Sequence, residues 1–199
     1  VLNTAVGFNA GLSVTTAQYN TLVGGVCGDS LTTGERNTAL GTFALTNDTK
    51  GSRNVALGYN TLGTQNFTTS TLSYNIAIGY EAGKLITDGI KNTLIGALAG
   101  DALTDADQNT AVGLAALSTD TLGSRSTAIG ESALVSQNFT TATESANTAV
   151  GYFAGGNLTD GTQNTYLGGN AGDTTTGGIQ NVCIGYTADV SGATNAREI

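Results

Sequence analysis

The sequence predicts an all-β protein built as a parallel β-solenoid of eleven coils. Three observations predict it. A pentapeptide of the type Asn-Thr-Ala-Val-Gly recurs along the whole 199-residue chain, and its spacing is nearly constant. The 29 Gly residues, which recur every few positions, disfavour helices, because an interior Gly costs a helix about 1 kcal/mol. A unit this short cannot bury a core alone, so stacked repeats are required.

The pentapeptide defines the coils, and its first residue is numbered position 0 here. That residue is Asn3, Asn20, Asn37, Asn54, Asn75, Asn92, Asn109, Ser126, Asn147, Asn164 and Asn181. The interval between them is constant, except that two coils are longer than the others. The long coils share the sequence Gln-Asn-Phe-Thr-Thr, at 65–69 and 137–141, and lie four coils apart. We therefore expect a single repeat array over 1–199, with four-coil units at 1–72, 73–144 and, in part, 145–199.

Both ends of the chain are in register with the repeat, and the chain does not begin with Met. We therefore expect it to be a segment of a longer array.

Position +4 is glycine in every coil, which predicts a backbone with positive φ or a close approach between backbones. These structural glycines are Gly7, Gly24, Gly41, Gly58, Gly79, Gly96, Gly113, Gly130, Gly151, Gly168 and Gly185.

Positions +1 to +3 predict a strand in each coil, since +1 is Thr, Val or Ile and +3 is Val, Leu or Ile. Position +2 points to the opposite face and is mostly Ala, so it is apolar too. Either Ala tolerates solvent there, or the strand has a second buried face against a neighbouring chain or wall. We expect two or three short strands per coil, turns at Thr33-Gly34, Asp88-Gly89 and Asp160-Gly161, and a ladder of stacked Asn side chains at position 0.

The composition argues against several function classes. The chain has no His, which removes the commonest general base and metal ligand, so we expect neither an enzyme nor a cofactor or metal site. The formal net charge of −8 argues against nucleic-acid binding. No apolar stretch is long enough to span a membrane, so we expect no membrane insertion by this segment.

The repeat resembles two families of surface fibres. Asn147-Thr148-Ala149-Val150-Gly151-Tyr152-Phe153-Ala154-Gly155 is similar to the repeat in the heads of trimeric autotransporter adhesins, and also to repeats of phage tail-fibre proteins. The resemblance covers all eleven coils, although the adhesin coil is shorter. It implies a left-handed β-roll, a homotrimer, an extracellular or virion-surface location, and attachment to a surface glycan or matrix protein of a host.

The two long coils are the candidate contact sites. We expect their extra residues to bulge at one angular place, as loops around Gln65, Asn66, Phe67, Thr68 and Gln137, Asn138, Phe139, Thr140. Exposed Phe side chains would contact a glycan or partner. The alternative is a loop that folds back over the edge of the core.

Other features have structural or chemical alternatives. Four Asn-x-Thr sequences, at Asn47, Asn66, Asn138 and Asn157, match the glycosylation pattern. Cys27 and Cys183 lie too far apart along the array to bridge within one chain, which leaves buried free thiols or an interchain bond. Asp88 and Asp105 occupy the same position of adjacent coils, where stacked carboxylates could hold Ca²⁺.

The sequence thus predicts a non-enzymatic fibrous protein, the β-roll section of a tail fibre or a surface adhesin. The alternative is a purely structural extracellular filament that assembles by end-to-end stacking.

Overall fold

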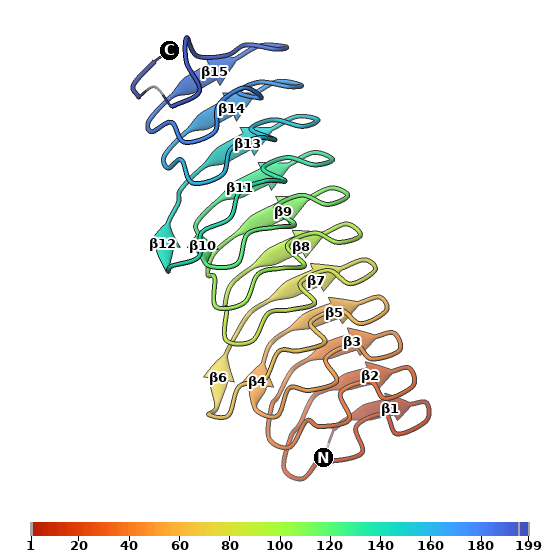
Figure 1. Cartoon of the computed structure of the whole chain (residues 1–199). Helices are drawn as coiled ribbons and strands as arrows, with labels where there is room; N and C mark the ends of the chain where they lie inside the picture. Colours follow the sequence, from red (N-terminus) through yellow and green to blue (C-terminus); the bar gives the residue numbers. More distant parts are fainter. Residues whose placement is uncertain (1, 195, 199) are drawn as a thin grey trace.

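The computed structural model describes residues 2–194 and 196–198, and within them it contains strands and turns but no helix. Eleven three-residue strands, one per coil, form a single parallel sheet along the molecule, and the two ends of the chain lie at opposite ends of the stack (Figure 1). The strands of this sheet are β1 (Thr4–Val6), β2 (Thr21–Val23), β3 (Thr38–Leu40), β5 (Val55–Leu57), β7 (Ile76–Ile78), β8 (Thr93–Ile95), β9 (Thr110–Val112), β11 (Thr127–Ile129), β13 (Thr148–Val150), β14 (Thr165–Leu167) and β15 (Val182–Ile184). The solenoid and its eleven coils are as predicted.

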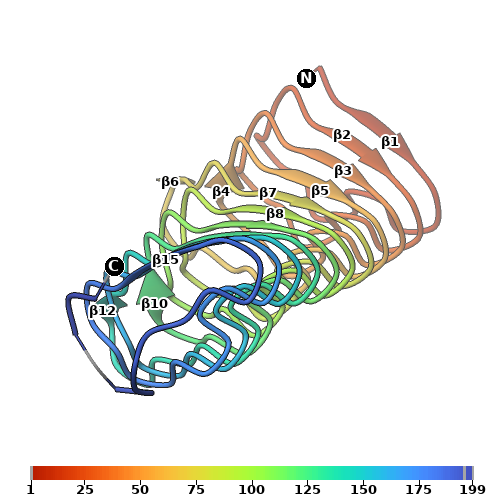
Figure 2. The same cartoon turned by 90° about the horizontal axis from the view of Figure 1, so that it is seen from above.

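The register of the sheet follows the repeat. Thr4 pairs with Thr21, and Val55 pairs with Ile76 across one of the long coils, so residues at equal repeat positions always face each other. At about 4.8 Å per coil, the array is roughly 50 Å long. In the turned view, the coils follow one another as loops of similar outline (Figure 2).

Each coil contributes one strand to this sheet, and four coils carry a second, two-residue strand outside it. The expected two or three strands per coil are therefore found in those four coils, and the other seven have one among the described residues. A run of turn residues, beginning at position +5, follows each strand. Non-glycine residues adopt positive φ at fixed places, as at Asn9, Leu45 and Arg36, and these interrupt extended backbone. The chain therefore folds mainly as turns whose N–H groups bond to neighbouring coils, such as Val26 N–H to the Phe8 carbonyl at 2.7 Å. The segments expected as turns, at Thr33, Asp88 and Asp160, are bends.

The strands turn the side chain at position +2 toward the core and the side chain at position +3 away from it. The side chain at position +2 is buried in ten of the eleven coils, from Leu22 to Cys183, whereas the aliphatic side chains at +3 point outward. The interior of a coil is narrow, so the strand presents Ala to it at most positions and carries its branched side chains outside. Both faces of the strand are therefore apolar. The +2 face is buried inside the coil, and the +1/+3 face lies on the surface.

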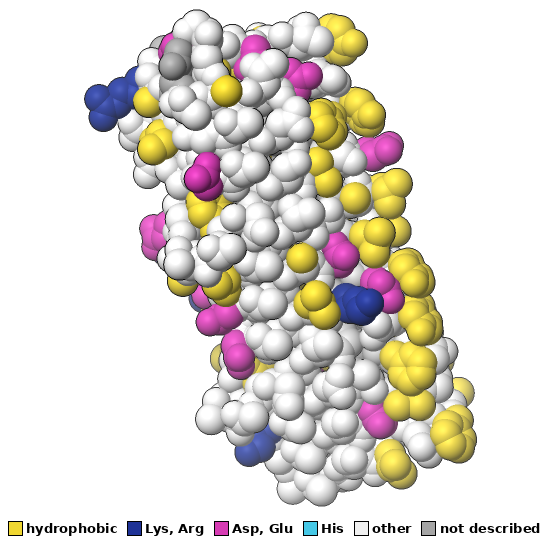
Figure 3. Space-filling view, viewed as in Figure 1, with side chains coloured by type: hydrophobic (Ala, Val, Ile, Leu, Met, Phe, Trp, Pro, Cys, Tyr) yellow, Lys and Arg dark blue, Asp and Glu magenta, His cyan; other side chains and the backbone are white. Residues whose placement is uncertain are grey.

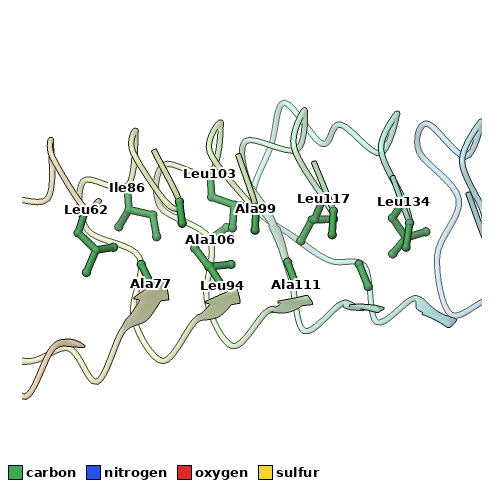
Figure 4. Packing of buried hydrophobic residues seen from close by; sticks show 14 of the residues in the cluster. Leu62, Ala77, Ile86, Leu94, Ala99, Leu103, Ala106, Ala111, Leu117 and Leu134 are labelled. Atoms are coloured by element: carbon green, nitrogen blue, oxygen red, sulfur yellow. The ribbon is translucent and has the colours of Figure 1, made fainter. Parts of the chain in front are cut away.

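The core is a single column of small and large side chains that alternate in space. Leu94 at +2 packs against Gly83 and Gly100, whereas Ala77 and Ala111 at +2 lie near Leu62 and Leu117 of the turns (Figure 4). In each four-coil unit, position +8 is Gly in two coils: the coil whose +2 residue is Leu or Tyr, and the coil before it. In the other coils of the unit, position +8 is Leu. Asp189 of the last coil is an exception. This alternation offsets large side chains against small ones along the tube.

The glycine column at position +4 has both properties that its uniformity predicts. Its φ values lie between 129° and 144°. A Cβ on Gly41 would lie 2.2 Å from the carbonyl oxygen of Gly58, and ten of the eleven positions make the same close approach to the next coil. A side chain here would push neighbouring coils apart.

The predicted asparagine ladder is present and buried. Asn3 Oδ1 accepts the backbone N–H of Asn20 at 2.8 Å, and the pattern repeats from coil to coil. Asn20 Nδ2 donates across its own coil to the Gly34 carbonyl at 2.9 Å. Each amide therefore ties the start of a coil to its far wall and to the next coil.

Candidate interaction surfaces

The outer apolar face is the first candidate surface, defined here as the side chains at positions +3 and +5. An aliphatic residue stands at +3 in all eleven coils, and Val6, Leu40 and Ile184 are exposed by 58%, 52% and 66%. Position +5 adds an aromatic side chain in five coils, whereas it is Gly, Thr or Glu in four others. The rings of Tyr59 and Tyr80 stack 5.6 Å apart with an interplanar angle of 9°. Hydrophobic side chains gather along the edge where the turns after the strands lie (Figure 3). Monomeric soluble proteins rarely expose so long an apolar patch.

The inserted loops are the second candidate surface, and they lie together with two small parallel sheets on one side of the solenoid (Figure 1). β4 (Gly51–Ser52) pairs with β6 (Thr71–Leu72), and β10 (Gly123–Ser124) pairs with β12 (Thr143–Glu144). The extra residues of each long coil precede β6 and β12. They bulge at the same angular place, as predicted.

The expectation that Phe67 and Phe139 offer contacts is wrong. Their side chains are only 5% and 7% exposed, because each loop folds back over the edge of the core, which is the alternative stated above. Gln65 and Gln137 are fully buried as well. Of the eight residues proposed for contact, Asn66, Thr68, Asn138 and Thr140 are exposed.

A buried carboxylate beneath each loop explains why the loops turn inward. Asp48 Oδ1 accepts the backbone N–H groups of Gly51 at 3.0 Å and Phe67 at 3.2 Å, and its Oδ2 accepts Gln65 Nε2 at 2.6 Å. Gln65 Oε1 in turn accepts Asn75 Nδ2 at 2.9 Å, which joins the network to the asparagine ladder.

The same arrangement recurs beneath the second loop. Asp120 accepts hydrogen bonds from the backbone N–H groups of Gly123 and Phe139 and from Gln137 Nε2. Sequence reasoning missed both carboxylates. The signal was available, because Asp and then Gln replace the usual aliphatic residue at position +11 of two successive coils, and the same pair recurs four coils later.

The glycosylation-type sequences divide into two groups. Asn47 Nδ2 and Asn157 Nδ2 donate to the carbonyls of Gly63 and Asp173, each at 2.6 Å. Asn66 and Asn138 are exposed in the loops, where their Oδ1 atoms accept Thr49 Oγ1 and Thr121 Oγ1.

Both cysteines are free and buried, as one of the two interpretations predicted. Burial, together with the nearby charge of Asp29, raises the pKa of the Cys27 thiol to about 11. A buried neutral thiol is a poor candidate for an interchain bond.

Burial and the charges of Asp88 and Asp107 raise the pKa of Asp105, which supports the expected closeness of the stacked aspartates. Within 2–194 and 196–198, however, no group of three or more His, Cys, Asp or Glu side chains is arranged to hold a metal ion.

Comparisons of the chain with models of protein families, with curated protein sequences and with solved structures give no match. In the described part of the chain, no helix is long and apolar enough to cross a membrane.

Proposed function

We propose that the chain is the rod section of a non-enzymatic, fibrous surface protein, a tail fibre or a bacterial surface adhesin, that associates with copies of itself and mediates attachment outside the cell or on a virion. One observation carries the proposal: an aliphatic side chain stands at +3 of the outer apolar face in all eleven coils, and in ten of them a large hydrophobic side chain at +3 or +5 is exposed. Each Val, Leu or Ile removed from water contributes about 1.5–3 kcal/mol, so a partner with the same repeat would gain from every coil.

A second copy of this chain is the occupant that fits this face best. The face has the same spacing in every copy, which gives register along the rod, and homo-oligomers are the commonest assemblies of soluble proteins. A homotrimer is the assembly that the resemblance to surface fibres implies. The inserted loops and the other sides of the coil would then remain free for attachment.

Sedimentation velocity of the purified chain tests this proposal. We expect a discrete trimer for the natural chain and a monomer for a variant with Ile95→Lys, Ile129→Lys and Leu167→Lys, because charges on the outer face cannot be desolvated at low cost. The matched control carries Thr68→Lys, Thr69→Lys and Thr140→Lys in the loops and should remain a trimer.

A natural chain that is monomeric at high concentration would contradict the proposal. Particles that lengthen without limit as concentration rises would favour the alternative, a structural filament.

A further inference from the structure

The last residue of each coil, at the position just before the next Asn, forms a column on the side of the inserted loops, and we call this column the basic ridge. It carries five of the chain's seven lysine and arginine residues, although the molecule as a whole is acidic. The remaining positions are mostly Tyr or Gln. In order, the ridge is Tyr19, Arg36, Arg53, Tyr74, Lys91, Gln108, Arg125, Ala146, Gln163, Gln180 and Arg197.

The backbone turns every ridge residue outward in the same way. Each has φ between 49° and 66°, a conformation that is unfavourable for residues other than glycine, and each is exposed. The ridge N–H groups bond to the preceding coil, as Arg53 N–H does to the Glu35 carbonyl at 2.9 Å. The side chains are thus held at intervals of one coil.

Neighbouring ridge side chains contact one another along the rod. The guanidinium of Arg36 lies 5.2 Å from the ring centre of Tyr19, and that of Arg53 lies 5.3 Å from the ring centre of Tyr74. Further along, Arg125 Nε donates to Gln108 Oε1 at 3.0 Å. These contacts give a strip of cations, aromatic rings and amides.

A hollow lies beside the second inserted loop on this strip. It is lined by Gln108, Arg125, Asp107 and Ser124 together with Thr143 and Glu144 of β12. The equivalent positions four coils earlier hold Arg36, Arg53, Glu35, Ser52, Thr71 and Leu72. The same six repeat positions therefore occur at two related sites along the ridge, one four-coil unit apart.

The two places differ in the charge available to a ligand. Arg125 Nη1 is paired with Glu144 Oε2 at 2.8 Å, whereas Leu72 stands at the equivalent position near Arg53. Among the described residues, no carboxylate lies within ion-pair distance of Arg53, whose contacts are with Tyr74. An anionic group would therefore find Arg53 more available than Arg125.

Arg36 Nη1 is paired with Glu35 Oε2 at 2.8 Å, so Arg53 is the more available of these two neighbouring arginines as well. We propose that the basic ridge binds a linear acidic polysaccharide laid along the rod, with a sugar carboxylate on Arg53 and with Arg36 as a second cation one coil away. Guanidinium groups bind carboxylates through paired hydrogen bonds. Ridge amides such as that of Gln108 can donate to sugar hydroxyls or accept from them, whereas carboxylates such as that of Glu35 can only accept. A sugar ring in an extended chain advances by a distance similar to the coil spacing of about 4.8 Å. The carboxylates that lie between the ridge cations would repel a nucleic acid, because duplex DNA carries one negative charge for about every 1.7 Å of its axis.

This inference rests on the proposed attachment function, because it names the ligand class of such a surface. The probe is immobilised polygalacturonate, with dextran as the neutral polymer and duplex DNA as the other polyanion. Arg36→Gln with Arg53→Gln is the test variant, since Gln occupies the ridge at three other coils and the fold should be preserved. Lys50→Gln with Lys84→Gln makes the same change in net charge at the two cations that are not ridge residues.

We expect the natural chain to bind polygalacturonate at low salt, the ridge variant to bind at least tenfold more weakly, and the control variant to change less than twofold. Glu144→Leu should strengthen binding two- to fivefold by freeing Arg125, whereas Asp160→Leu, which makes the same change in net charge outside both the ridge and the outer apolar face, should not. Equal losses in both double variants, no preference over dextran, or equal binding to DNA would overturn the inference.

Sedimentation of the same samples separates the two proposals. If the chain is a trimer that does not bind polygalacturonate, the ligand proposal is wrong and the assembly proposal stands. If it is a monomer that binds through the ridge, the ligand proposal stands and the assembly proposal is wrong.

Discussion

At the scale of single residues, Tyr166 is the residue that departs most from its column. It occupies position +2, where the core otherwise holds Ala, Leu or Cys, and it is fully buried between Gly155 and Gly172. Among the described residues its hydroxyl makes no hydrogen bond, although Thr175, whose Oγ1 donates to Asp189 Oδ1 at 3.2 Å, lies nearby. Burial accordingly raises the pKa of Tyr166.

We expect Tyr166→Phe to raise the free energy of unfolding by about 1–2 kcal/mol, because it removes a buried polar group without partners. Urea denaturation measures the change. Tyr166→Ala, which leaves a cavity, should instead lower stability by about 3–5 kcal/mol. A destabilised Phe variant would show that the hydroxyl is satisfied in solution.

Cys27 provides a second prediction at this scale. Its thiol is buried, and its pKa of about 11 keeps it protonated at pH 8. We expect iodoacetamide to leave both natural cysteines unmodified in the folded chain and to modify both in denaturant, as intact mass would show. Thr68→Cys, at an exposed loop position, should react readily without denaturant. Rapid modification of Cys27 in the folded chain would mean that the coil opens locally.

At the scale of elements, the buried carboxylate under the first loop predicts a dependence of stability on pH. Burial raises the pKa of Asp48 above its ordinary value of 3.8, although the hydrogen bonds that it accepts favour the ionised form. The folded chain therefore holds this proton more tightly than the unfolded chain does. The contribution of Asp48 to stability is complete below pH 3.8 and falls as the pH rises through the higher folded-state pKa.

Denaturant unfolding between pH 3.5 and 7 checks this for the natural chain and for Asp48→Asn. We expect the difference in unfolding free energy, natural minus variant, to decrease as pH rises across that window. Asp160→Asn, at an exposed carboxylate, is the control. A difference that stays constant with pH would show that folding does not change the pKa of Asp48.

The alternation of large and small core residues predicts strong coupling between a turn and its strand. A Cβ at Gly100 would lie 2.8 Å from Leu94 Cδ2, so Gly100→Leu should destabilise by about 1–3 kcal/mol through overpacking. Leu94→Ala alone should cost about 2–5 kcal/mol through its cavity. The double variant recreates the arrangement of Leu117 with Ala111 and should recover much of both losses. Additive losses in urea denaturation would contradict this packing.

At the scale of the whole molecule, periodicity made most of the fold predictable. Coil number, parallel stacking, the glycine column and the asparagine ladder follow from which residue types recur at each position. The direction of the strand faces could not be read, because +2 and +3 are both apolar and the sequence does not say which one faces the narrow interior. The buried position of Phe67 depends on a hydrogen bond from its backbone N–H to Asp48 in the preceding coil. Comparing residues at one repeat position does not reveal such a contact between two different positions.

The direction of the hydrogen bonds that join the coils has a mechanical consequence. These bonds run from one coil to the next, along the rod, as between Gly24 N–H and the Val6 carbonyl at 2.8 Å. Tension applied to the two ends therefore loads the coils in series, so the weakest coil should peel away before the others yield. Each released coil frees on the order of 50 Å of slack, the extended length of one repeat. In an optical trap we expect a staircase of such steps at low force, the response of an extensible tether rather than a stiff strut.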